Sequence, residues 1–442
     1  MFKSLQKIRK SLSFSLTIII AISAVLQNLS FAQILKSDLP VTNSGIYTMY
    51  KDGNTMYVGG PFSYAGPSTG RGVLLDSQTG LYDKNFPKVN GTINVCVPDN
   101  NGGWYIGGQF TKVGSEFRNS VAHIRAGGQI DDWNPNIIFA EQYYGTPLVN
   151  TIALNNSIIY IGGAFDRVGS AVRNNLTAVD LNGVATSWNP DPTILAEINT
   201  IVATDTVVYF GGNFATLNVG INANIPRLNL AAVDVKDGMP TSWNAPVTGQ
   251  QSLIMVYGLC LSDTILFVCG NFDYIGGMTR HRVGAVSTKL AGNSGTTVTS
   301  WNPQTTNYFL NPTAIIYSII TNGDSVFIGG NFDKFGASAR TKLALVSKSS
   351  GAIFPWNPVF SEPSWAQGGV KVAVKCLAIY DNTLYVGGSF SVIQGITRNN
   401  LAAFDLKDGT LNNWNPYVSN SVLSIQATSG GIYAGGDFTS VN

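Results

Sequence analysis

Histidine and charged residues are scarce in this chain of 442 residues. His123 and His281 are the two histidines, so a His-rich metal centre is excluded and a Ser-His-Asp triad has few places to form. Charged residues make up 12% of the chain, and its net charge of +2 is too small to be a basic footprint for binding nucleic acid. We expect structural roles for both histidines, no nucleic acid partner, and no catalytic, cofactor-binding or metal-binding residues.

Cysteine is also sparse, and its spacing is irregular. Cys96, Cys260, Cys269 and Cys376 match no zinc-binding spacing. A bridge between Cys260 and Cys269 across a hairpin is an alternative that secretion would permit. We predict buried free thiols instead, because the cysteines do not recur at matching places.

The first 32 residues have the pattern of a cleavable signal peptide. Lys3, Lys7, Arg9 and Lys10 precede a mostly apolar segment at 12–26, and Ser30 and Ala32 are the small residues before a cut. The apolar segment is short for a membrane span, and no later segment is long and apolar enough for one. Cleavage after Ala32 removes four basic residues, leaving 23 basic against 25 acidic residues. We predict a secreted or cell-surface protein with no membrane span after cleavage.

One motif, aromatic-x-Gly-Gly-x-Phe with a single Cys substitution, recurs along the remaining chain. Its copies are YVGGPF (57–62), YIGGQF (105–110), YIGGAF (160–165), YFGGNF (209–214), FVCGNF (267–272), FIGGNF (327–332), YVGGSF (385–390) and YAGGDF (433–438). A near-constant step of about 50 residues identifies a repeat architecture. Paired glycines in a strand let another backbone or a ring approach closely, and the Phe can then fill the space between units.

Each repeat predicts four short strands. An apolar strand precedes the motif, an Arg opens a third strand after it, and a fourth strand ends at an aromatic residue, as in Trp133, Trp188, Trp243, Trp301, Trp356 and Trp414. Four strands per unit, repeated without helical periodicity, predict an all-β fold, a β-propeller of four-stranded antiparallel blades.

The number of blades follows from counting the strands of each repeat. Eight first-and-second strand pairs are present, but only seven third-and-fourth pairs, and no Arg follows YAGGDFTSVN before Asn442. The pattern therefore favours a repeat domain at 33–442 that is C-terminally truncated inside an incomplete eighth blade. The alternative is a seven-bladed ring with an overhanging hairpin.

The repeat resembles a known family. The order [YF]-x-G-G-x-F, R-x-x-L-A-x-[VF]-D and W-N-P, and especially RNSVAHIRAGGQIDDWNP at 118–135, is similar to the delta-60 type repeat of bacterial propeller-like proteins. Kelch repeats and a fungal cortical polarity marker are more weakly similar. The resemblance covers about residues 46–442 and implies a fold, but no catalytic residues.

Arg and Asp recur together in several repeats. Asp180, Asp234 and Asp405 each follow a repeated Arg by seven residues. They could form an ion-binding ring, but residues that recur with the repeat more often serve its structure. We therefore predict a structural network within each blade.

Partner binding is expected on non-periodic loops between the fourth strand of one unit and the first strand of the next. These loops carry the aromatic candidates for a protein or glycan partner, although packing on their own blades is the other interpretation: Phe139, Tyr143, Tyr144, Tyr308, Phe309, Phe360 and Trp365.

We therefore predict a non-enzymatic propeller acting in adhesion, binding or scaffolding. One alternative is a polysaccharide-acting hydrolase, which needs paired carboxyl groups, with Glu141, Glu197 and Glu362 as candidates. Another is a purely structural module of a larger surface protein.

Overall fold

The computed structural model describes residues 41–42, 46–52, 55–59, 65–141, 145–193, 196–219, 224–290, 296–303, 314–361 and 372–442. All of them belong to one unit, Pro40–Asn442, and their regular secondary structure consists of strands. Among these residues no helix is long and apolar enough to cross a membrane. The predicted cleavage after Ala32 lies outside the described residues.

Seven antiparallel sheets carry the repeat. The first strand of each is apolar and precedes the motif: β6 (Thr92–Pro98), β12 (Leu148–Asn155), β17 (Glu197–Ala203), β23 (Val256–Ser262), β29 (Ile316–Asn322), β35 (Ala373–Tyr380) and β40 (Val422–Thr428). The second strand holds the glycines: β7 (Trp104–Gln109), β13 (Ile158–Ala164), β18 (Val207–Asn213), β24 (Ile265–Gly270), β30 (Ser325–Gly330), β36 (Thr383–Ser389) and β41 (Gly431–Gly436).

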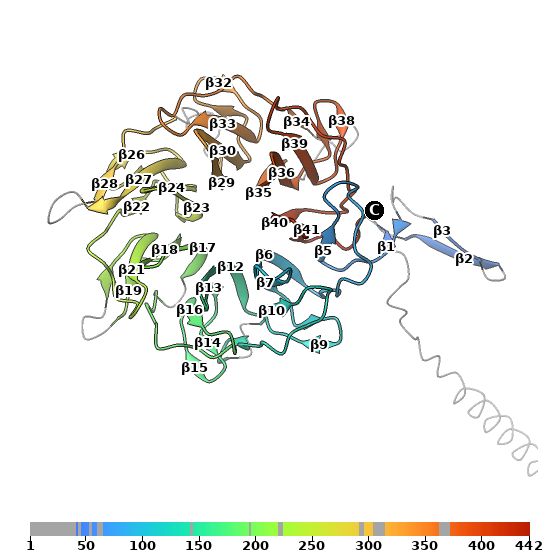
Figure 1. Cartoon of the computed structure of the whole chain (residues 1–442), viewed down its shortest axis with the longest axis horizontal. Helices are drawn as coiled ribbons and strands as arrows, with labels where there is room; N and C mark the ends of the chain where they lie inside the picture. The colour runs from blue at the N-terminus through green and yellow to red at the C-terminus, as the bar shows by residue number, and fades with distance from the viewer. Residues whose placement is uncertain are drawn as a thin grey trace, which may run out of the picture. The chain divides into compact units, whose positions relative to one another are not determined.

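The third strand pairs with the second on its other side. These strands are β10 (Val121–Ile124), β16 (Leu176–Val179), β21 (Leu230–Asp234), β27 (Val283–Leu290), β33 (Leu343–Ser347), β39 (Leu401–Asp405) and β5 (Gly72–Leu75). The fourth strand is β28 (Thr296–Val298) in one sheet, and single bridges such as Val179 to Ala185 mark its place elsewhere. Consecutive first strands contact one another in a closed cycle, from β6 through β40 and back to β6, and they surround the centre of the ring (Figure 1). This arrangement makes the fold a β-propeller.

The last sheet is closed by a strand from the other end of the chain. β5 pairs with β41, so that Gly72 lies opposite Gly435 and Leu75 opposite Ile432. The sequence analysis left the third-strand place of the last repeat empty and favoured an incomplete eighth blade. β5 occupies that place, although it follows the first motif along the chain.

Small strands join the connections between the main strands. One set forms three-stranded sheets: β11 (Ile137–Ile138) with β14 (Arg167–Val168) and β15 (Ala171–Val172), β22 (Val247–Thr248) with β25 (Tyr274–Ile275) and β26 (Met278–Thr279), and β34 (Phe360–Ser361) with β37 (Val392–Ile393) and β38 (Ile396–Thr397). Others form pairs: β1 (Val41–Thr42) with β4 (Ala65–Gly66), β2 (Thr48–Asp52) with β3 (Thr55–Gly59), β8 (Lys112–Val113) with β9 (Glu116–Phe117), β19 (Thr216–Leu217) with β20 (Ile225–Pro226), and β31 (Lys334–Phe335) with β32 (Ser338–Ala339).

The core lies between neighbouring sheets and is built from the repeated aromatic residues. The Phe of each motif in the ring is at most 5% exposed, as seen for Phe110, Phe165, Phe214, Phe272, Phe332, Phe390 and Phe438. The Trp of one sheet meets the motif's first aromatic ring edge-on, with centroids 5.1 Å apart for Tyr160 and Trp188. The indole of Trp188 also donates to the carbonyl of Asp234 in the next sheet, at 2.9 Å. The aromatic residues of the repeat therefore join each sheet to its neighbour.

The repeated Arg fastens the fourth strand of its own sheet. Arg173 Nη1 donates to the Val172 carbonyl at 2.7 Å, and its Nη2 donates to the Thr186 carbonyl at 2.6 Å. The same pair of bonds recurs at Arg118, Arg227, Arg280, Arg340 and Arg398.

The recurring Asp caps the next turn instead of pairing with that Arg. The carboxylate of Asp180 accepts from the Val184 backbone N–H at 2.8 Å, and those of Asp234 and Asp405 accept from Lys236 and Lys407 in the same way. Arg and Asp thus serve each sheet's structure, as the sequence predicted.

Candidate binding site at the centre of the ring

Every first strand contains a β-bulge at the same place. The register slips by one residue between Ile93 and Val95, and at the equivalent point in the six other first strands. A bulge leaves its extra residue outside the ladder and redirects its side chain. The seven bulge residues, named here the axial ring, are all half-buried: Asn94, Asn150, Asn199, Tyr257, Tyr317, Lys375 and Leu423.

The first part of the axial ring is a chain of side-chain amides. Asn94 Nδ2 donates to Asn150 Oδ1 at 3.1 Å, and Asn150 Nδ2 donates to Asn199 Oδ1 at 2.9 Å. Asn150 Nδ2 also donates to a carboxylate oxygen of Glu197 at 2.8 Å. Asn199 Nδ2 is shielded from solvent and has no partner among the described residues. The chain of amides therefore ends in a buried donor that no described residue uses.

The second part of the axial ring is aromatic. The rings of Tyr257 and Tyr317 lie 5.5 Å apart at an angle of 63°. Burial, and then Tyr317 and Glu197, raise the pKa of Tyr257 to about 12, and burial raises the pKa of Tyr317 as well. Both phenols are neutral near pH 7, as a tyrosine of ordinary pKa also is, and each can donate a hydrogen bond.

One cation completes the axial ring. Burial lowers the pKa of Lys375, while Asp437 acts in the opposite direction. The axial ring thus has one charged member, Lys375, and the Glu197 carboxylate lies beside the ring, bonded to Asn150. Its other members are amides, phenols and one leucine, a set suited to an uncharged ligand rich in hydroxyl groups.

The aromatic residues predicted to bind a partner on loops are not all on exposed loops in the structure. Phe360 is 4% exposed in β34 and packs against Phe390, with ring centroids 5.2 Å apart. It follows Trp356 by four residues, as the buried Val418 follows Trp414, so it belongs to the repeat and was wrongly predicted as a partner-binding residue. Phe139 is half-buried after β11. Tyr143, Tyr144, Tyr308, Phe309 and Trp365 lie outside the described residues, and their role stays a prediction.

The carboxyl candidates for a hydrolase do not form a described pair. Glu141 is exposed, Glu197 bonds to Asn150 in the axial ring, and Glu362 lies outside the described residues. In the described part of the chain, no group of three His, Cys, Asp or Glu side chains gathers to hold a metal.

His123 is held between two carboxylates within one sheet. Its Nε2 lies 3.0 Å from Asp99 Oδ2 and its Nδ1 lies 3.4 Å from Asp131 Oδ2, while its ring stacks on Tyr105 at 4.2 Å. A catalytic histidine needs one ring nitrogen directed at a nucleophile. Both nitrogens face carboxylates, so the geometry supports the predicted structural role. His281 likewise contacts Asp273, at 3.4 Å.

The His123 cluster predicts a specific acid sensitivity. Burial raises the pKa of Asp99, but hydrogen bonds from the backbone of Asn101, from His123 and from the backbone of Gly103 outweigh it, so the pKa lies below the ordinary 3.8. A lowered carboxyl pKa stabilises the fold above the unfolded-state pKa, and that stability is lost as pH falls through the folded-state pKa. Asp99→Asn should therefore cost about 1 kcal/mol at pH 6, and less as pH falls below about 3.8. Urea unfolding across that range measures the difference, with the exposed Asp132→Asn as the matched control.

The four cysteines are free. Cys96, Cys269 and Cys376 are buried and Cys260 is half-buried, as the sequence predicted for all but the last. Burial raises the pKa of Cys96 to about 12, with a smaller opposing effect of Ser424. Such thiols are unreactive while the sheets stay closed.

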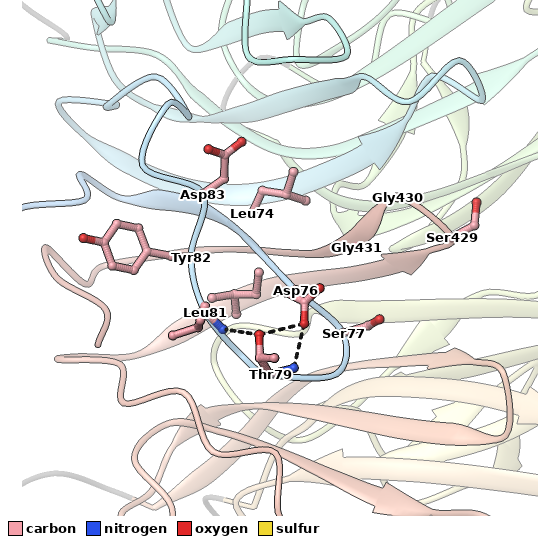
Figure 2. A pocket seen from close by; sticks show the side chains of 11 residues that line it. Leu74, Asp76, Ser77, Thr79, Leu81, Tyr82, Asp83, Ser429, Gly430 and Gly431 are labelled. Carbon is pink, nitrogen blue, oxygen red and sulfur yellow. Dashed lines mark hydrogen bonds between the residues drawn. The ribbon is translucent and has the colours of Figure 1, made fainter.

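A hollow of about 500 Å³ lies where β5 meets the turn between β40 and β41. Figure 2 shows Asp76 and Thr79 in its wall, with Asp76 Oδ1 accepting from the Thr79 hydroxyl at 2.7 Å and from its backbone N–H at 2.6 Å. The second acidic residue in the wall, Asp83, accepts from the Asn85 backbone N–H at 2.8 Å. Both carboxylates therefore hold turns, and the hollow lies where the first and last parts of the ring meet. We assign the ligand site to the axial ring instead.

Comparison with known proteins adds fold likeness alone. No family model matches the sequence, and no curated protein does. A computationally designed protein, Ika8, is similar in structure over 91% of this chain and 97% of its own, at 14% identity and a TM-score of 0.46. The WD40 β-propeller domain of Doa1 is similar over 79% of this chain and 91% of its own, at 11% identity and a TM-score of 0.45. The extracellular domain of BT4673 from B. thetaiotaomicron is similar over 84% of this chain but 39% of its own, at 12% identity and a TM-score of 0.45.

Proposed function

We propose that this chain is a secreted or cell-surface binding module, a seven-bladed propeller that does no chemistry on its ligand. The signal-peptide pattern before Gln33 supports secretion. The cycle of first strands and the pairing of β5 with β41 support the number of blades. The repeated residues of the sheets are used in holding the fold, which leaves recognition to positions where the repeats differ.

We infer that the axial ring binds an uncharged saccharide. The observation that carries this inference is the arrangement on neighbouring first strands of bonded amides, the Glu197 carboxylate and the Tyr257 and Tyr317 pair. Sugar hydroxyls can donate to the Glu197 carboxylate, while the apolar face of a pyranose packs on an aromatic ring. A neutral sugar also fits a site where the one cation of the axial ring, Lys375, is accompanied by the Glu197 carboxylate bonded to Asn150.

The test is a calorimetric titration of the full chain with neutral oligosaccharides. Tyr257→Ala and Tyr317→Ala should each weaken binding about tenfold or more, because each removes an aromatic face from the site. Tyr50→Ala is the matched control, since Tyr50 is 67% exposed on the β2–β3 hairpin. Circular dichroism of each variant confirms that the fold survives.

Three outcomes would overturn this assignment. Unchanged affinity in both axial-ring variants would show that the saccharide does not bind at the axial ring. Release of reducing sugar by the wild-type chain would show that the protein is a hydrolase. Loss of binding in Trp365→Ala with none in the tyrosine variants moves recognition to the loops that the sequence favoured.

A further inference from the structure

The β2–β3 hairpin repeats the first two strands of a blade without a third strand. Thr48 pairs with Gly59, Met49 with Val58 and Tyr50 with Tyr57. In β12 and β13, Thr151 pairs with Gly162, Ile152 with Ile161 and Ala153 with Tyr160. The two registers match residue for residue from the first glycine of the motif onward. β3 nevertheless pairs with no other described strand.

Side chains that are buried in every blade are exposed on this hairpin. Val58 is 38% exposed, although its counterparts in the seven sheets, Ile106, Ile161, Phe210, Val268, Ile328, Val386 and Ala434, are all 0% exposed. Met49, the counterpart of Ile152, is 66% exposed against 5%. The hairpin therefore has the residues of a blade interior on its surface, next to an unpaired strand edge.

β5 lies at the right place in the chain to be the third strand of this hairpin. In five of the sheets the motif's first glycine position and its third-strand partner are 14 residues apart, as in the pair Gly162 and Leu176. Gly59 and Gly72 are 13 apart, and Gly72 is the residue that pairs with Gly435 in β41. The position of β5 in the chain thus suits pairing with either of two strands. One is β3, which is nearby in the sequence, and the other is β41, at the far end of the chain.

We propose that β5 exchanges between β41 and β3. In the state described here β5 closes the last sheet, held by Trp414 donating to the Asp76 carbonyl at 3.0 Å and by Arg71 donating to the Asp437 carbonyl at 2.9 Å. In the other state β5 pairs with β3, with Gly72 opposite Gly59 and Val73 opposite Val58. The edge of β41 is then free to accept an extended strand. Local pairing closes a much shorter loop, and its smaller entropic cost offsets part of the free energy needed to separate β5 from β41.

Two disulfide pairs test the exchange in the full chain. Val73→Cys with Ala434→Cys joins the observed pair, since Val73 lies opposite Ala434. Val58→Cys with Val73→Cys joins the alternative pair, and Val58→Cys with Leu75→Cys is the control, shifted by two residues along the same strand. The native thiols are buried or half-buried, and peptide mapping identifies each bridge.

The exchange predicts an order of bridge formation under mild oxidation. The observed pair should already be bridged in protein that folds under oxidising conditions, because Val73 and Ala434 lie opposite each other in the closed sheet. The alternative pair should accumulate over minutes to hours as a monomer, at least about tenfold faster than the control. Amide exchange in β12, followed in the same samples, must stay protected, which shows that the ring did not unfold globally. Equal rates for the alternative pair and the control, or a product that is only a disulfide-linked dimer, would overturn the proposal.

Discussion

Replacing Gly163 with alanine should lower the free energy of unfolding by about 3 kcal/mol, the upper range for overpacking a close-packed interior. A Cβ on this second glycine of the motif would lie 1.9 Å from the Leu148 carbonyl oxygen, which is backbone and cannot move aside cheaply. The equivalent glycine of every other sheet in the ring faces a backbone carbonyl in the same way, at 1.9 to 2.4 Å. Denaturant unfolding of the variant measures the loss.

Gly162→Ala is the matched control for the first glycine. Its Cβ would meet Ile198 Cγ2 at 2.7 Å and Thr151 Cγ2 at 2.9 Å, both ends of side chains that can shift, so the cost should be about 1 kcal/mol. The chain already contains this change in one sheet, where Cys269 replaces the first glycine and Gly258 stands opposite it. A larger loss for Gly162→Ala than for Gly163→Ala would contradict the roles given to the two glycines.

Asp273→Ala should destabilise the protein by about 3–5 kcal/mol, the usual cost of leaving one member of a buried ion pair alone. Asp273 is 1% exposed and accepts from Arg282 Nη1 at 2.7 Å and from the Gln250 backbone N–H at 2.8 Å. Arg282 is 4% exposed, so water cannot solvate its guanidinium group once the Asp273 carboxylate is removed. Equilibrium unfolding in guanidinium chloride measures the change.

A double variant separates the lost pair from a general defect. The neighbouring sheet has uncharged residues at the two equivalent positions. Ala215 stands in place of Asp273, and Asn229 stands in place of Arg282. Asn229 donates to the Val247 carbonyl at 2.8 Å. The double variant Asp273→Ala with Arg282→Asn introduces the same two residues. It should restore most of the free energy of unfolding that Asp273→Ala loses. If the double variant is as unstable as Asp273→Ala alone, the cost does not come from the stranded arginine.

The residues of the repeat predicted the fold because each has a structural role that depends on its neighbours in the sequence. The glycine doublet, its Phe and the later Trp point to sheets that pack closely on one another through aromatic side chains, and those are the contacts that the sheets make. The closure by β5 was missed because nothing local to β41 signals it. Gly72 lies opposite Gly435 across more than 300 residues, and only the geometry of a closed ring brings them together.

The axial ring was not singled out by the sequence analysis, although a signal for it exists. Aligning the first strands places a variable residue between a buried β-branched residue and the residue at which the ladder resumes, as in Val149-Asn150-Thr151 and Ile316-Tyr317-Ser318. Side chains that vary at a fixed structural position are candidates for recognition, whereas Phe360 looked like a loop residue and is part of the repeat. The bulge that turns these side chains out of the ladder has no signature of its own in residue type.

Amide hydrogen exchange with and without a neutral oligosaccharide tests the central claim most directly. Binding at the axial ring should slow exchange in β17, β23 and β29, the first strands that carry Asn199, Tyr257 and Tyr317, and should leave the β2–β3 hairpin unchanged. Protection confined to the connections between sheets, with the first strands unaffected at saturating saccharide, would contradict the claim.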